Sequence, residues 1–362
     1  MIRPRHVLPA VFLSLVAVVS PATVLQGQDV RYEIHFPAPE GYQTLVCDLH
    51  MHTVFSDGLV WPTVRVEEAW RQGLNVMSIT DHIEYQPHKD DVKTNHNRPY
   101  ELVEDQAKGL DLMLIRATEI TRDTPPGHFN AIFLEDINPL ETPEFLDAIK
   151  AANAQGAFVM WNHQGWKGEE KGSWQEVHTT MLEGKLFHGM EVCNGGTYFP
   201  TAHKWCLEKN LTMIGNSDIH DPDLLTRSTA AEHRTTTLVF AKEKTPESVK
   251  EALFAGRTVV WCKDQLIGRR EQLEPLFYGA VKLSQPIQRS GKSVWFQLQN
   301  GCTADIKLAK SAGNGPAAIT IPAYGTVSVR FSVAAEDTPV DLQYTATNLL
   351  IAPETGLPVT LK

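Results

Sequence analysis

The chain has 362 residues, of which 42% are hydrophobic and 21% are charged. This length is sufficient for one large domain with a sizeable core and a second, smaller domain. The formal net charge of −10 argues against a protein that grips a long nucleic-acid polymer, because such proteins need a basic face. It does not exclude small anionic substrates, since a bound metal ion can invert the local field.

The N-terminus has the pattern of a secretory signal peptide. Arg3 and Arg5 precede an apolar run at residues 7–19, which is too short to span a bilayer comfortably, and a small, polar stretch follows. We therefore predict a signal peptide at residues 1–28, cleaved between residues 20 and 28. The mature protein is expected to be exported, periplasmic or extracellular, with no membrane contact. An uncleaved anchor helix is the less favoured alternative.

The cysteines lie far apart in the sequence, at residues 47, 193, 206, 262 and 302. Their odd number and wide spacing do not make a disulfide framework, although one pair could close in an exported protein. The sequence does not indicate which pair that would be, and it leaves the oligomeric state open.

From residue 45 to about 262, short apolar runs alternate with helical patterns. Strands are predicted at residues 45–52, 74–82, 110–121, 128–135, 157–163, 189–195, 212–220 and 235–241. Helices are predicted at 63–73, ending at Gly73, at 142–156 with Thr142 as N-cap and Pro143 following, and near 174–183, 199–209 and 246–255. This alternation predicts an α/β domain on a parallel sheet, closed or open.

Residues 281–362 have a different character. Short apolar runs are separated by Gly, Pro and Asn, and helical periodicity disappears. A segment of this kind and length predicts a small all-β sandwich. We therefore expect two domains after the signal peptide, at residues 29–280 and 281–362.

Two histidines stand at the end of the first predicted strand, in the segment CDLHMHTVFSDG. Because residues i and i+2 of a strand point to the same face, His50 and His52 project together. In a (β/α) barrel this end of the strands carries the active site. Asp57 follows in the next turn, so this short segment could build a metal site. A His-x-His pair alone is weak evidence.

Further polar residues stand at the boundaries of other predicted strands. They are His82 in ITDH, Glu119 in RATEIT, His128 in GHFNAIF, His163 in WNH, and Asp218 and His220 in NSDIH. Such a repeated placement is not expected from scattered histidines. The set is too large for one tetrahedral metal, and it indicates two or three ions that share a bridging carboxylate.

The segments DLHMHTVFSDG, ITDH, GHFNAIF, WNH and NSDIH resemble, in order, the motifs of the PHP (polymerase and histidinol phosphatase) superfamily over residues 45–265. The resemblance implies an α/β fold, a distorted (β/α)7 barrel, followed here by the small all-β sandwich, which we expect to be Ig-like. It also implies two or three divalent metal ions (Zn, Mn or Fe) and hydrolysis of phosphoesters by metal-bound hydroxide.

The resemblance further implies a role for individual residues. His50, His52 and Asp218 would hold one metal. Glu119 would bridge it to a second, which His128 and His163 also bind, and Asp57, His82 and His220 would hold the third. Many family members carry histidine at the position of Asp57, so the third site is expected to differ in strength or selectivity. Glu119, His128 and Asp218 are the predicted catalytic residues.

Residues that contact the substrate are harder to read from the sequence. Phosphate usually binds arginine or lysine, and Arg234 before the strand at 235–241 is the strongest candidate. Weaker candidates are His233, Arg227 and Lys167. Residues 95–101 could line the cleft, and Trp61, Trp161 and Trp166 could wall it or simply pack. Cys193 is more readily a buried thiol than a ligand, and His203 a packing residue.

The sequence therefore predicts an exported, metal-dependent phosphoesterase acting on small phosphomonoesters, such as nucleotides or sugar phosphates, without a nucleic-acid polymer as partner. A phosphodiesterase is the nearest alternative. A second alternative is a non-catalytic, metal-stabilised scaffold that carries a binding sandwich. A carbohydrate substrate without phosphate also stays open, because loops set the specificity.

Overall fold

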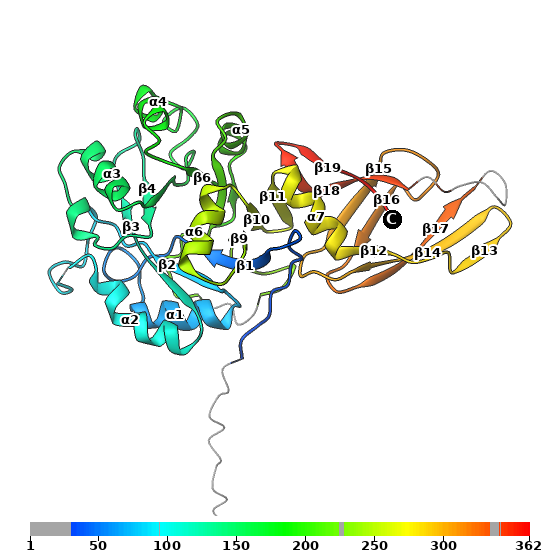
Figure 1. Ribbon diagram of the computed structural model, residues 1–362, viewed down its shortest axis with the longest axis horizontal. Helices are drawn as coiled ribbons and strands as arrows, with labels where there is room; N and C mark the ends of the chain where they lie inside the picture. The colour runs from blue at the N-terminus through cyan, green and yellow to red at the C-terminus, as the bar shows by residue number, and fades with distance from the viewer. Residues whose placement is uncertain (1–29, 94, 224–227, 334–339, 341) are drawn as a thin grey trace, which may run out of the picture. The chain divides into compact units, whose positions relative to one another are not determined.

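The computed structural model describes residues 30–93, 95–223, 228–333, 340 and 342–362 (Figure 1). The predicted signal peptide at residues 1–28 and Arg227 lie outside these residues. The chain divides into two units, residues 1–30 and 31–362, and every element described below belongs to the second. Within the described part of the chain, no helix has the length and apolar character needed to cross a membrane.

The first domain alternates strands and helices up to residue 280. Its strands are β1 (Gln43–Asp48), β2 (Val76–Ile79), β3 (Met113–Ile120), β4 (Phe129–Ile132), β5 (Phe158–Trp161), β6 (Gly189–Asn194), β7 (Thr197–Tyr198), β8 (Thr212–Asn216), β9 (Thr236–Ala241), β10 (Thr258–Cys262) and β11 (Gln265–Gly268). Its helices are α1 (Pro62–Arg71), α2 (Arg98–Gly109), the 3-10 turn η1 (Asn138–Leu140), α3 (Phe145–Ala154), α4 (Glu176–Glu183), α5 (Pro200–Glu208), α6 (Pro246–Phe254) and α7 (Arg270–Ala280).

The sheet of this domain is mixed rather than parallel throughout. Strands β1, β2 and β3 run parallel to one another, as do β5, β6 and β8. Strand β4 is antiparallel to both β3 and β5, and β9 is antiparallel to β1. The connection from β3 to β4 contains no helix, and such a short connection can join only antiparallel strands. The expectation of a parallel sheet is therefore wrong at β4, and it is also wrong at β9.

Threonine side chains join β8 to the strands that face it. The hydroxyl of Thr237 on β9 accepts from the Gly215 backbone N–H at 2.9 Å and donates to the Gly215 carbonyl at 2.8 Å. Thr258 on β10 donates to the carbonyl of Met213 at 2.7 Å. A Cβ on Gly215 would lie 2.2 Å from a Val260 methyl group, so only glycine permits this close approach. Side-chain hydrogen bonds therefore connect β8 to β9 and β10, with which it forms no backbone ladder among the described strands.

The helices α1 and α2 pack side by side (Figure 1). The sequence did not predict α2, whose buried residues Pro99, Val103 and Ala107 form only a narrow stripe. It did not predict α7 either. Helix α3 begins at Phe145 with Glu144 as N-cap, so the assignment of Thr142 as N-cap is wrong. The glycine that ends α1, Gly73, has a φ of 89°, as expected after a helix end.

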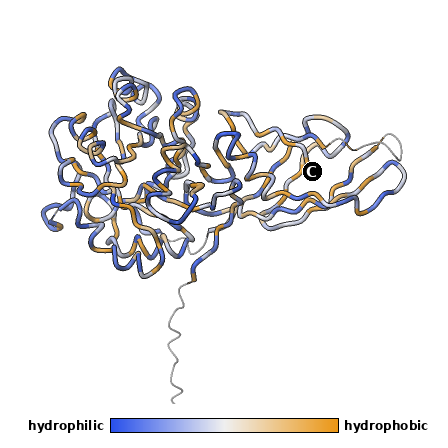
Figure 2. The backbone as a smooth tube through the Cα atoms, viewed as in Figure 1, coloured by the Kyte–Doolittle hydropathy of each residue, from blue (hydrophilic) through white to orange (hydrophobic). Residues whose placement is uncertain are grey.

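The second domain consists of two packed antiparallel sheets. One contains β12 (Val281–Leu283), β13 (Gln288–Ser290), β14 (Ser293–Asn300) and β17 (Thr326–Ser332), and the other β15 (Ile306–Lys310), β16 (Ala318–Ile321), β18 (Gln343–Ala352) and β19 (Thr355–Thr360). Hydrophobic and hydrophilic residues alternate along these strands (Figure 2). In β14, Val294, Phe296 and Leu298 point inward, which is the pattern of a sandwich strand.

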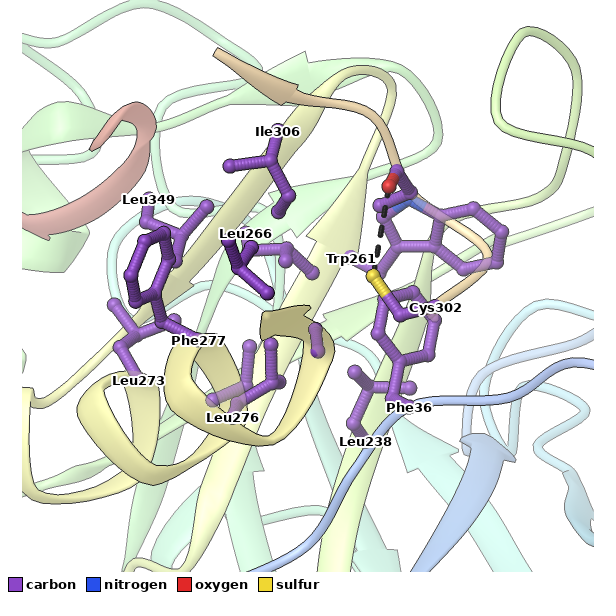
Figure 3. Packing of buried hydrophobic residues seen from close by; sticks show 14 of the residues in the cluster. Phe36, Leu238, Trp261, Leu266, Leu273, Leu276, Phe277, Cys302, Ile306 and Leu349 are labelled. Atoms are coloured by element: carbon purple, nitrogen blue, oxygen red, sulfur yellow. Dashed lines mark hydrogen bonds between the residues drawn. The ribbon is translucent and has the colours of Figure 1, made fainter. Parts of the chain in front are cut away.

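The two domains share one continuous sheet and one core. Strand β11 pairs in parallel with β18, with Leu266 opposite Leu349. Helix α7 covers this junction, and Phe36 meets Trp261 edge-on at a ring-centroid distance of 5.0 Å. Figure 3 shows the packing of the junction, with the labelled residues Phe36, Leu238, Trp261, Leu266, Leu273, Leu276, Phe277, Cys302, Ile306 and Leu349. Apolar burial therefore fixes the second domain to the first.

We predict that Leu266→Ala lowers the free energy of unfolding by about 2–5 kcal/mol, because it opens a cavity at a fully buried position of this junction. Urea denaturation of the full chain measures the change. Ile287→Ala, at a side chain that is 51% exposed, serves as the control and should cost far less. Equal losses in the two variants would contradict the shared core.

Candidate metal centre

A cluster of imidazoles and carboxylates lies where the barrel strands end, and we call it the polar cluster. It contains all the residues that the sequence proposed as metal ligands: His50, His52, Asp57, His82, Glu119, His128, His163, Asp218 and His220. These residues form overlapping groups whose nitrogen and oxygen atoms lie within 4.8 Å of one another. The structure therefore brings together side chains from six separate chain segments.

Backbone pairing continues beyond the strands and brings these segments into register. Met51 and Ile219 form an isolated parallel bridge, with Asp218 N–H donating to the His50 carbonyl at 2.9 Å. A second isolated bridge joins His82 to Glu119. Each bridge sets the ligands of one chain segment beside those of another.

The tightest part of the polar cluster surrounds His50 and His52. Their Nε2 atoms lie 3.1 Å apart, and each lies 3.1 Å from Asp218 Oδ1. Glu119 Oε2 lies 3.1 Å from His50 Nε2 and 3.2 Å from His52 Nε2. Neighbouring ligands of one ion bound at about 2.0–2.2 Å are separated by roughly 3 Å, so these atoms have the spacing of a metal site.

Glu119 extends the polar cluster toward two more histidines. Its Oε1 atom lies 2.9 Å from His128 Nδ1 and 3.6 Å from His163 Nε2, while Oε2 faces His50 and His52. The carboxylate is fully buried. Its two oxygens thus face different sets of imidazoles, which is the arrangement that a bridging carboxylate needs.

The third part of the polar cluster surrounds Asp57. Its Oδ1 atom lies 3.2 Å from His220 Nε2, 3.5 Å from His82 Nε2 and 3.7 Å from His52 Nδ1. His220 donates from Nδ1 to the carbonyl of Asp218 at 2.8 Å. This hydrogen bond leaves the Nε2 lone pair directed at Asp57.

The loop that carries Asp57 is held rigidly. Asp81 accepts hydrogen bonds from the Thr53 N–H at 2.6 Å, the Thr53 hydroxyl at 2.6 Å and the Ser56 hydroxyl at 2.8 Å. A Cβ on Gly58 would lie 2.6 Å from the Thr53 nitrogen, so this turn requires glycine. Asp81 therefore positions the loop and is not one of the clustered donors.

The polar cluster places carboxylates next to imidazoles in a buried site, and each kind of group shifts the pKa of the other. Burial alone would raise the pKa of the Glu119 and Asp218 carboxyls, but the facing imidazoles hold both well below their usual range. Burial would lower the pKa of His52, but hydrogen bonds and charge from Asp218 and Glu119 raise it to about 9. At neutral pH the carboxylates thus require either imidazolium protons or a cation, and a metal ion would displace these protons.

Two buried carboxylate oxygens of the polar cluster support the presence of a cation. Asp218 Oδ1 lies 3.1 Å from the Nε2 atoms of His50 and His52, and Asp57 Oδ1 lies 3.2 Å from His220 Nε2, but neither oxygen has a well-aligned donor among the described residues. His163 and Asp218 also have positive φ angles of 26° and 52°, which non-glycine residues rarely adopt. Buried acceptors without a donor are costly, so the donor set fits divalent metal ions.

A cavity of about 510 Å³ opens beside the polar cluster. Its wall includes imidazoles and carboxylates of the cluster together with Trp166, Phe199, Asn194 and Thr197. A small molecule in this cavity would contact the clustered donors directly.

One solved structure is similar along nearly its whole length. It is a two-domain protein from Bacteroides vulgatus, described as containing a predicted PHP-like metal-dependent phosphoesterase, and it is 44% identical with a TM-score of 0.87. The similarity covers 92% of this chain and 99% of that chain. The chain belongs to the PHP-like metal-dependent phosphoesterase family. The fold class inferred from the sequence is thereby confirmed, and the polar cluster is called the PHP centre below.

Other comparisons add less. A family model described as an Ig-like domain matches residues 281–362, which agrees with the sandwich. A protein of Bifidobacterium adolescentis described as a metal-dependent phosphoesterase is 17% identical with a TM-score of 0.40, over 49% of this chain and 88% of that one. An amidohydrolase of Chromobacterium violaceum is 14% identical with a TM-score of 0.38, over the same shares. These two values are too low to carry an argument. A search among curated proteins gives no match.

Glu191 supports the PHP centre, and sequence reasoning missed it. It lies fully buried on β6 and accepts from His50 Nδ1 at 2.8 Å and from the His163 backbone N–H at 2.9 Å. It also accepts from the side-chain amides of Asn194 and Asn216. Because Nδ1 of His50 donates to Glu191, the Nε2 lone pair faces the centre. The available signal was a lone acid inside the apolar run GMEVCNG.

Arg65 on α1 is a second residue that sequence reasoning missed. Its fully buried guanidinium donates to the His52 carbonyl at 2.9 Å and to the carbonyls of residues 219–221 at 2.6–3.2 Å. It also pairs with Glu68 at 2.7 Å. One cation thus ties together the two loops that supply histidine pairs to the PHP centre.

Arg234, the residue expected to bind phosphate, does not line the cavity. Its buried guanidinium donates to Gln72 at 2.7 Å, Asp48 at 3.1 Å and Asp223 at 2.6 Å. Asp48 also accepts from the Ser217 N–H at 3.1 Å. These bonds give Arg234 a positioning role behind the PHP centre. It lines a second cavity of about 490 Å³ that shares Asp218 and His220 with the first, so its contact with substrate stays a prediction. An arginine before a strand looks the same in sequence whether it is free or paired.

The weaker substrate candidates also have partners within the protein. Lys167 pairs with Asp123 at 2.8 Å and lies over the Trp166 ring. His233 stacks on Trp261 at a centroid distance of 3.4 Å. The described part of residues 95–101 is absent from the cavity wall, and helix α2 begins within it.

The remaining residues named from the sequence are structural or exposed. Trp161 is buried against His178, and Trp61 is 43% exposed, whereas Trp166 lines the cavity. His203 is buried beside the Tyr198 hydroxyl at 2.9 Å, as a packing residue would be. Cys193 is buried and belongs to none of the clustered donor groups found in the described chain.

We predict that Glu191→Gln weakens metal binding by about 10–100-fold, because an amide NH₂ replaces an oxygen that accepts hydrogen bonds from the ligand segments. Competition with a chromophoric chelator measures the affinity. Glu208→Gln, at a side chain that is 51% exposed on α5, is the matched control and should retain the wild-type affinity. An unchanged affinity in Glu191→Gln would refute the supporting role.

Proposed function

We propose that this protein hydrolyses small phosphoesters with divalent metal ions held by the PHP centre. The observation that carries the proposal is the convergence of His50 Nε2, His52 Nε2 and Asp218 Oδ1 at mutual distances of 3.1 Å. Lone pairs that face one another at this distance in a buried site need a shared proton or cation. The 44% identical relative, described as containing a metal-dependent phosphoesterase, supports the reaction type.

The donor set supports two or three ions, with the ligands divided as the family resemblance implies. His50, His52 and Asp218 would hold one ion. His128 and His163 would hold a second, with Glu119 between the two, and Asp57, His82 and His220 would hold a third. Mixed imidazole and carboxylate ligands suit Zn, Mn or Fe. The proximity of His52 Nδ1 to Asp57 does not alter this division, because its Nε2 faces His50.

Bound ions of this kind supply an activated water molecule and neutralise phosphoryl oxygens. The chain itself contributes fixed positions. Glu119 holds its two oxygens toward separate sets of histidines, and Glu191 fixes the ring orientation of His50. Asn194 Nδ2 donates to Asp218 Oδ2 at 3.1 Å and thereby orients the other oxygen toward His50 and His52. Preorganised ligands of this kind avoid reorganisation during the reaction.

A small phosphomonoester is the substrate class that fits best. The cavity of about 510 Å³ holds a molecule of nucleotide or sugar-phosphate size, and the acidic chain is a poor partner for a nucleic-acid polymer. A phosphodiester is the closest alternative, because the same donors would serve both esters. The third possibility is a scaffold that binds metal without turnover.

The test is hydrolysis of 4-nitrophenyl phosphate by the full mature chain loaded with Zn²⁺ or Mn²⁺. We expect turnover that a chelator abolishes and added metal restores. Glu119→Gln should lower kcat/KM more than about 100-fold, because it removes the charge of the shared carboxylate. Glu208→Gln is again the control. Metal binding without turnover in the wild type would favour the scaffold, and bis(4-nitrophenyl) phosphate as the better substrate would favour the diesterase.

We also propose that the protein is exported after cleavage between residues 20 and 28. The support is the basic start followed by the apolar run at residues 7–19. Expression in a Gram-negative host, followed by cell fractionation and intact-mass measurement, checks this. We expect a periplasmic or secreted species that lacks the first 20 to 28 residues. A full-length chain in the membrane fraction would show instead an uncleaved anchor.

A further inference from the structure

The cavity beside the PHP centre has an aromatic wall. Trp166 and Phe199 both line it, and Trp166 is 50% exposed. The Trp166 ring lies at a centroid distance of 5.6 Å from both His128 and His163. A large indole so exposed next to the clustered donors is unusual, because burying it elsewhere would be favourable.

The indole of Trp166 is held in place before any ligand arrives. Lys167 Nζ lies 4.7 Å from the centre of its ring, and Asp123 binds the same ammonium at 2.8 Å. The backbone N–H of Trp166 donates to the His163 carbonyl at 3.0 Å, so the ring and the histidine share one turn. Such anchoring lowers the entropy that stacking would otherwise cost.

Phe199 completes the wall through close contact with glycine. A Cβ on Gly165 would lie 3.3 Å from the Phe199 ring and 2.9 Å from Glu169 Oε1. The small residue therefore permits Phe199 to approach the turn that carries Trp166. The carboxylate of Glu169 therefore lies beside Gly165 at this part of the wall.

The charges around the cavity restrict what can occupy the aromatic end. Among the described residues, no lysine or arginine lines the cavity, whereas Asp57, Glu119 and Asp218 do. Metal ions at the PHP centre would neutralise one phosphoryl group. At the aromatic end, the Lys167 ammonium lies 4.7 Å from the centre of the Trp166 ring but is already paired with Asp123. A second phosphoryl group there would compete with Asp123 for this ammonium and would lie near Glu169, so a neutral group fits better.

We propose that the substrate carries a neutral, planar aromatic ring that stacks on Trp166, together with a single phosphoryl group at the PHP centre. This inference rests on the proposed function, and it selects ring-bearing esters such as nucleoside monophosphates over bare sugar phosphates. Stacking of a base on an aromatic side chain is tolerant of ring identity, so the wall selects a class and not one compound.

The test compares adenosine 5′-monophosphate with ribose 5-phosphate, because both esters leave through the primary 5-hydroxyl of ribose and differ at C1, which carries the base in one and a hydroxyl in the other. We expect the metal-loaded wild type to prefer the nucleotide in kcat/KM by roughly 5–100-fold. Trp166→Ala should remove this preference by lowering kcat/KM for the nucleotide far more than for ribose 5-phosphate, while Trp166→Phe should retain most of it. Trp61→Ala, at an exposed tryptophan outside the cavity wall, is the matched control.

Equal losses on both substrates in Trp166→Ala, or no preference in the wild type, would overturn the ring-binding inference. Calorimetric binding of the same two compounds to the metal-loaded chain separates this result from a failure of the proposed function. If neither of these compounds and neither 4-nitrophenyl ester is hydrolysed, the phosphoesterase proposal fails. Tighter binding of the nucleotide that Trp166→Ala abolishes would still support the ring site, and equal binding would refute it.

Discussion

The centre of this protein depends on backbone pairing that continues past the ends of the barrel strands. The bridges Met51–Ile219 and His82–Glu119 set ligand segments side by side where regular sheet structure has already stopped. Arg65 reinforces the first bridge, because one buried guanidinium binds carbonyls on both loops. Side chains on separate loops could not keep separations near 3 Å without such backbone restraint.

A second layer of buried polar groups makes this arrangement stable. Glu191 accepts four hydrogen bonds, Asp81 accepts three in the loop before Asp57, and Asp48 joins Ser217 to Arg234. The partners of these carboxylates are amide and hydroxyl groups, Nδ1 of His50 in the case of Glu191, and Arg234 in the case of Asp48. The remaining carboxylates, above all Glu119 and Asp218, face imidazoles. The excess negative charge is thus concentrated where cations would bind.

The sequence revealed the metal ligands because they lie near the ends of apolar strands, Glu119 inside β3 and the others in the segments that flank strands. His-x-His and Asp-x-His each bring both side chains into the polar cluster, although these residues lie just beyond β1 and β8 and Asp218 has a positive φ. Glu191, Arg65 and the true environment of Arg234 were not predictable in this way, because their partners lie far away along the chain. The antiparallel direction of β4 and β9 was not predicted either. Helix α2 was missed because its apolar stripe is narrow. Periodicity reports burial, but it does not report strand direction or the pairing of charges.

The pairing of β11 with β18 has a consequence for how the two domains can be separated. Were the chain cut after residue 280, β11 would lose its neighbour on one side and present Leu266 and Ile267 on an open sheet edge. Open apolar edges recruit strands from other molecules. A truncated first domain is therefore expected to aggregate. In the full chain, β18 of the sandwich pairs with β11 and covers this edge.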